Sequence, residues 1–149
     1  MPKSKPIVQV ACICEKVLIE PDNVASLIRI VDTYMLRVPP NEPLPKGVGV
    51  ELTAFVSLKS GDVVGEFQVG LQLKDPDGNE TPLGKWPIVL NGDEHGANLR
   101  IDFSLANPKI GLYWFVLLWR EEELTSIPFR LKYAPLAAET GPPSESETH

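Results

Sequence analysis

The side chains that could do chemistry gather in two short acidic stretches. The first is 75–80, DPDGNE, where Asp75, Asp77 and Asn79 would supply several oxygen ligands close together. The complete spacing of a calcium-binding loop, with its distal glutamate, is absent. Pro-Asp-Gly between two apolar runs is instead typical of a hairpin turn. The stretch therefore predicts a turn, with calcium binding as the alternative.

The second stretch, 91–96, brings two carboxylates and a histidine next to one another in sequence. Groups that act as an acid–base pair or a ligand cage normally converge from separate elements, so a solvated loop is the plainer interpretation. The alternative is a small-ligand or carbohydrate-binding site formed by loops at one end of the domain, with a tryptophan as stacking platform. The candidate residues for such a site are Asp75, Asp77, Trp86, Asp93 and His95.

Cys12 and Cys14 are the two cysteines, and on a strand they would point to the same face about 6 to 7 Å apart. A disulfide at that distance would be strained, and two thiolates supply only half of a structural zinc site. We interpret them as small buried apolar residues. The sequence holds no Gly-x-Ser-x-Gly elbow, phosphate loop, dinucleotide fingerprint or histidine-rich metal motif, so we expect no enzyme activity, no cofactor and no metal.

Charge and hydropathy limit the kinds of partner that the protein could bind and the compartment that we expect for it. The 149 residues carry a formal net charge of −6, which disfavours binding to nucleic acid and to anionic membranes. No apolar run approaches the roughly 20 residues of a membrane span, and MPKSKPIVQV does not resemble a signal peptide, so we expect a cytoplasmic protein. One domain over 1–134 and a disordered, Pro-, Ser- and Glu-rich tail over 135–149 are predicted.

The elements that must position any site are strands. Alternating apolar residues predict strands over 7–19, 25–34, 48–59, 63–74, 81–90 and 98–105, and two more within 107–133. Ser60-Gly61-Asp62 predicts a hairpin turn, and the four prolines of 38–46 predict a connection outside the ladder. Residues 24–36 also fit an amphipathic helix, which stays open as the alternative. About eight strands indicate a single-domain antiparallel β-sandwich with a jelly-roll, C2-like or immunoglobulin-like order.

The last hairpin carries the main hypothesis about function, because its first strand is apolar on both faces. One face holds Leu112, Trp114, Val116 and Leu118, and the other holds Tyr113, Phe115, Leu117 and Trp119. A second apolar face must be covered by something. We expect Tyr113, Phe115, Leu117 and Trp119 to contact a protein partner or a second copy in a homodimer; the alternative is that the monomer covers them with 24–36 or with the proline-rich connection.

Short motifs along the chain complete the sequence evidence. Cys14-Glu15 ends the first apolar run, and Ser26-Leu27-Ile28 precedes Asp32. Gly111, Tyr113 and Phe115 form a Gly-x-Tyr-x-Phe strand, and Ile127-Pro128 lies in the last one. In these motifs, which span Val10 to Tyr133, the chain resembles a family of small uncharacterised bacterial all-β proteins. The resemblance implies an all-β fold and a strand over 25–34, and it implies no catalytic residue.

Overall fold

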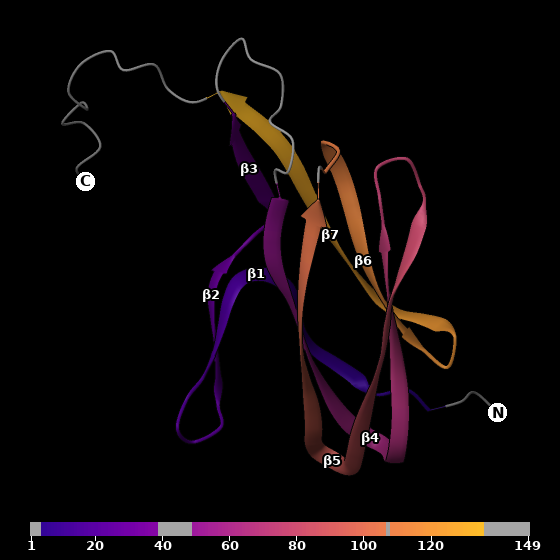
Figure 1. The fold of residues 1–149 in the computed structure, drawn as a ribbon. Helices are drawn as coiled ribbons and strands as arrows, with labels where there is room; N and C mark the ends of the chain where they lie inside the picture. Colours follow the sequence, from indigo (N-terminus) through magenta and orange to yellow (C-terminus); the bar gives the residue numbers. More distant parts are fainter. Residues whose placement is uncertain (1–3, 39–48, 107, 136–149) are drawn as a thin grey trace.

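The computed structural model describes residues 4–38, 49–106 and 108–135 (Figure 1). Apart from their first residues, the predicted connection over 38–46 and the predicted tail over 135–149 lie outside this part of the chain. The described residues form strands and no helix, so the all-β prediction is confirmed. No helix long and apolar enough to cross a membrane occurs among them.

Seven strands make up one curled, mixed sheet in the described ranges. They are β1 (Ile7–Ile19), β2 (Ala25–Ile30), β3 (Thr33–Val38), β4 (Gly49–Lys74), β5 (Glu80–Ala106), β6 (Gly111–Trp119) and β7 (Glu122–Pro135). Their order is β2-β1-β4-β6-β7-β3, and β5 pairs with β4 outside this path. The expected eight strands are therefore seven, and hydrogen bonds join them into a single sheet.

The centre of the fold is one long, bent hairpin of β4 and β5. The two strands pair from Gly49 with Ala106 to Lys74 with Glu80, so the hairpin turn predicted at 60–62 and the loop predicted at 91–96 are wrong. Both stretches are irregular bends within continuous strands, with register shifts around Gly61. Glycine beside short polar residues is typical of turns and also of bulges, so sequence alone does not separate the two. The turn predicted over 75–80 is confirmed as the tip of this hairpin.

Close backbone contacts hold the bend. Gly61 has a φ of 58°, a left-handed conformation that glycine adopts without strain. A Cβ added to Gly96 would lie 1.8 Å from the carbonyl oxygen of Leu58, so only glycine fits there. The buried Ser60 hydroxyl donates a hydrogen bond to the His95 carbonyl oxygen at 2.5 Å. The bend turns the hairpin back on itself, and its two arms face each other (Figure 1).

The main hydrophobic core lies on the concave side of the sheet. The Phe103 ring, from one arm, lies 5.5 Å from the Phe115 ring and 5.9 Å from the Phe129 ring. The largest fully buried residues of this core include Phe115, Phe129, Ile13, Leu58, Leu71, Leu90, Leu117 and Leu131. A smaller cluster of Cys14, Val17 and Phe55 lies apart from it. Cys14 is a free, fully buried thiol, which confirms its interpretation as an apolar residue.

Residues 25–34 form no helix, so the helix alternative is wrong, and the single strand predicted there is two strands, β2 and the start of β3. The chain breaks at Val31-Asp32 and changes partner. The Val31 N–H donates to the Ile13 carbonyl oxygen at 2.7 Å, and the Arg130 N–H donates to the Asp32 carbonyl oxygen at 2.9 Å. From there β3 runs parallel to β7, which corrects the expectation of a wholly antiparallel sheet.

Pro128 lies where β7 has one neighbour only. It pairs with Trp114 on β6, whereas β3 begins to pair with β7 at Arg130. A residue without an N–H is tolerated there, because no second ladder needs it. The second half of β7 is an inner strand, because β3 pairs with it from Arg130 onward.

Candidate functional site

The four residues predicted to form an interface are in the core. Tyr113, Phe115, Leu117 and Trp119 are at most 3% exposed and belong to the main hydrophobic cluster. The monomer covers them, chiefly with the two arms of the β4–β5 hairpin, so this face is not available to a partner. Alternation separates the two faces of a strand, but it does not tell which face points inward when both are apolar.

The opposite face of β6 is half-buried and apolar. Leu112, Trp114, Val116 and Leu118 lie on it, and we call these four residues the β6 outer row. Their neighbours on β4 are Lys74, Gln72 and Gly70, and their neighbours on β7 are Arg130, Pro128, Ser126 and Glu123. A depression of about 240 Å³ between these strands is lined by Lys74, Trp114, Val116, Glu123 and Ser126. One apolar face of β6 is thus at the surface, and it is the face opposite to the four residues that the sequence analysis predicted to form an interface.

Charges at the two ends of the β6 outer row have opposite sign. Arg130 pairs with Leu112 at one end, and Lys74 pairs with the next residue of the row, Trp114. Glu123 pairs with Leu118 at the other end. The surface is therefore an apolar row with a cationic end and an anionic end.

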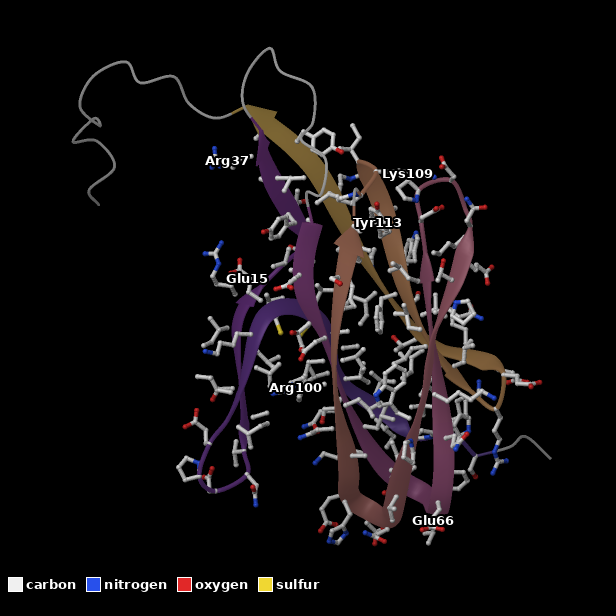
Figure 2. The ribbon with its side chains drawn as sticks, viewed as in Figure 1. Glu15, Arg37, Glu66, Arg100, Lys109 and Tyr113 are labelled. Carbon is white, nitrogen blue, oxygen red and sulfur yellow. The ribbon has the colours of Figure 1, made fainter. Side chains whose placement is uncertain are left out.

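The two aspartates of the hairpin tip, Asp75 and Asp77, stabilise the turn and bind a lysine. Asp75 Oδ1 accepts hydrogen bonds from the Asp77 and Asn79 N–H groups, both at 2.9 Å. Lys109 Nζ contacts the carboxylate of Asp77 and lies 3.6 Å from that of Asp75 (Figure 2). Desolvation opposes ionisation of Asp75, but the hydrogen bonds from Asn79 and Asp77 and the Lys109 charge outweigh it and lower its pKa. An ammonium group therefore occupies the place where the calcium alternative would put a cation.

The other ligand-loop candidates lie elsewhere. Asp93 and His95 are in the bend of β5, midway along the β4–β5 hairpin and away from its tip (Figure 1). His95 Nδ1 is 3.2 Å from the Gly92 carbonyl oxygen. Trp86 is half-buried and packs against the core, next to Gly84. The five candidates do not converge, and no group of three or more His, Cys, Asp or Glu suited to a metal occurs in the described ranges.

Sequence reasoning missed a cleft that lies where β2 gives way to β3. It measures about 610 Å³ and is lined by residues that include Glu15, Arg29, Asp32, Thr33, Met35 and Arg37. Arg29 Nε lies 2.7 Å from Glu15 Oε2, and this ion pair raises the pKa of the arginine. Glu15 and Arg37 lie on the same side of the molecule (Figure 2). The sequence signal at this place is the ambiguity of residues 24–36, which fit both a strand and an amphipathic helix.

The fold defines an all-β protein built on one curled mixed sheet. No family model matches the sequence, and no curated protein matches it. Solved structures are similar to the chain at low identity, and three of them serve as examples. The first is a β-glucosidase from Kluyveromyces marxianus, with 14% identity and a TM-score of 0.46 over 58% of this chain and 14% of that one. The second is a β-glucosidase from Listeria innocua, with 10% identity and a TM-score of 0.44 over 92% of this chain and 17% of that one. The third is the alkylpurine DNA glycosylase AlkC from Pseudomonas fluorescens, with 11% identity and a TM-score of 0.46 over 88% of this chain and 31% of that one.

The chain spans less than a third of the length of each of these structures. At these identities and TM-scores the similarity assigns no family and no activity. The resemblance to small bacterial all-β proteins stays a prediction.

Proposed function

We propose that this protein is a non-catalytic self-association module whose β6 outer row packs against the same row of a second copy. The observation that carries the proposal is a half-buried row of four large apolar side chains with opposite charges at its two ends. Contiguous apolar surface on a folded protein usually marks an interface. The curled sheet, with its two arms over one core, would serve as a rigid β-sandwich-like support for that row.

The row complements itself under two-fold symmetry. In an isologous contact the same patch on both copies meets, so each residue needs a suitable counterpart within the patch. A two-fold axis that crosses β6 between Trp114 and Val116 lays Leu112 over the copy's Leu118 and Trp114 over the copy's Val116. Apolar side chains then meet apolar side chains along the whole row.

The flanking charges fit the same axis. Arg130 pairs with Leu112 and Glu123 pairs with Leu118, so the axis brings Arg130 of each copy to Glu123 of the other. A parallel arrangement of the two rows would instead place like charges opposite each other, which is unfavourable. The charge pattern therefore favours a second copy in the antiparallel orientation.

The experiment that tests the proposal is light scattering of wild-type protein and of Trp114→Glu across a concentration range. Wild type should form a dimer, and Trp114→Glu should weaken it at least ~100-fold, because burying an unpaired carboxylate is costly. Ile19→Glu is the matched control, since Ile19 is an exposed apolar residue (54%) on the β1–β2 hairpin and its substitution should leave the dimer unchanged. A wild type that is monomeric throughout, or a Trp114→Glu variant that dimerises as tightly as wild type, would refute the proposal.

A further inference from the structure

We propose that the free edge of β3, which borders the 610 Å³ cleft, binds an extended peptide as an added strand, with an acidic side chain of the peptide next to Arg37. This site is separate from the β6 outer row and does not depend on self-association. Four features of the described residues support it: the direction of the β3 backbone groups, the shape of the cleft, the fixed ion pair beside it and the side chains along the edge.

Among the residues that the structure describes, the backbone of β3 is paired on one side only. β3 is the last strand of the sheet, and its described neighbour is β7. The Asp32 carbonyl oxygen accepts from the Arg130 N–H, and in a parallel ladder every second residue then bonds to that neighbour. The N–H and C=O groups of Thr33, Met35 and Arg37 therefore point away from β7. Edge groups of this kind are a template for another strand.

The edge lies in a cleft that has room for a ligand. Thr33, Met35 and Arg37 all line it, together with Arg29 and Glu15 from the neighbouring strands. Its volume of about 610 Å³ falls within the roughly 300–1,000 Å³ of sites that hold small ligands and short segments. The unpaired backbone groups and the hollow thus coincide, which is the arrangement that peptide binding by strand addition needs.

Arg29, which lines the cleft next to β3, has a strained backbone conformation. Arg29 has a φ of 57°, a left-handed conformation that is unfavourable for a residue with a Cβ. This conformation accompanies the Arg29–Glu15 ion pair, in which Glu15 neutralises the guanidinium. Arg37 is different, because no carboxylate in the described ranges lies within ion-pair distance of it. Arg37 is therefore the cation that the cleft offers to a ligand.

The outward side chains of β3 set the ligand chemistry. Thr33, Met35 and Arg37 form a row of a hydroxyl, an apolar group and a guanidinium, and Met35 is 45% exposed. Side chains of neighbouring strands lie beside each other across the ladder, so an added peptide would place an apolar residue next to Met35 and a carboxylate next to Arg37. Met35 and Arg37 lie on the same face of β3, so the occupant is an extended peptide with an apolar residue and an acidic residue two positions apart.

The test is a titration of ¹⁵N-labelled full-length protein, followed by NMR, with the capped heptapeptide acetyl-Thr-Glu-Thr-Val-Thr-Glu-Thr-amide, which places valine next to Met35 and glutamate next to Arg37 in either strand direction. Binding should shift the amide signals of Thr33, Met35 and Arg37 and slow their hydrogen exchange. The same peptide with its three central residues, Thr-Val-Thr, N-methylated should bind at least tenfold more weakly, because in either strand direction these residues no longer donate to the edge of β3. The lysine counterpart of the peptide should also bind more weakly to wild type, and Arg37→Glu should reverse that preference.

Three results would overturn the inference. One is the absence of any shift over 33–37 at millimolar peptide. Another is equal binding of the N-methylated peptide, which would mean that side chains alone hold the ligand. The third is an unchanged preference in Arg37→Glu. Arg37 is exposed, so the variant should fold, and a matching circular dichroism spectrum checks this.

Discussion

Phe115 and Trp114 are neighbours on β6 that point to opposite faces, and the fold gives them opposite roles. Phe115 is 0% exposed, and its ring lies 5.5 Å from that of Phe103. Phe115→Ala removes a fully buried ring and leaves a cavity, which costs about 3–5 kcal/mol. For a chain of this size each kcal/mol lowers the melting temperature by roughly 2–4 °C, so we expect a decrease of about 6–20 °C.

The matched variant is Trp114→Ala. Trp114 is half-buried on the outer row, so at low protein concentration its removal should cost about 1 kcal/mol of monomer stability. Urea unfolding of both variants, each at concentrations where the protein is monomeric, gives the two free energies. Equal costs, or a larger cost for Trp114→Ala, would mean that the core lies on the other face of β6 and would refute the assignment.

Two further predictions concern the bend and the buried thiol. Gly96→Ala should destabilise the protein by about 3 kcal/mol or more in urea unfolding, because the new Cβ would lie 1.8 Å from the Leu58 carbonyl oxygen. The control is Gly49→Ala, whose Cβ would lie 3.5 Å from its nearest contact and which should change stability by less than about 1 kcal/mol. Equal effects of the two substitutions would contradict the bend geometry. Burial, with Cys12 alongside, raises the pKa of Cys14 to about 11 from 9.0. As the pH rises, the Cys14 thiol therefore ionises in the unfolded chain before it does so in the folded protein. The free energy of unfolding should be highest below pH 9 and should fall between pH 9 and about 11. Cys14→Ala should make this fall of the unfolding free energy with pH less steep. An identical slope in the variant would show that Cys14 ionises normally.

The sequence predicted most strands because alternation is a local property. The runs over 7–19 and 98–105 and the turn at 75–80 fold as their residues indicate. The pairing of these strands depends on bends that local patterns do not specify. Ser60-Gly61-Asp62 is a good turn sequence, yet the close approach of Gly96 to Leu58 makes it a bulge in a continuous hairpin.

The candidate site was predictable in part. The apolar character of both faces of β6 identified the strand, but the inward face is decided by what packs on it, and Phe103 from a distant strand packs on Phe115. The cleft beside β3 was beyond sequence reasoning, because it forms only where the chain passes from β2, which pairs with β1, to β3, which pairs with β7. That change of partner rests on two backbone hydrogen bonds at Val31 and Asp32.

The most direct measurement of the proposed interface is native mass spectrometry of two charge-reversal variants, Arg130→Glu and Glu123→Arg, alone and mixed. In either variant alone, the two-fold contact would place like charges opposite each other at both ends, so the dimer should be weaker than that of wild type. In the mixture, the carboxylate introduced at position 130 of one variant would meet the guanidinium introduced at position 123 of the other. The unchanged Glu123 of the first variant would likewise meet the unchanged Arg130 of the second, so a heterodimer should prevail over both homodimers. A statistical mixture of dimers, or no dimer in wild type either, would contradict the proposal that β6 outer rows pack antiparallel.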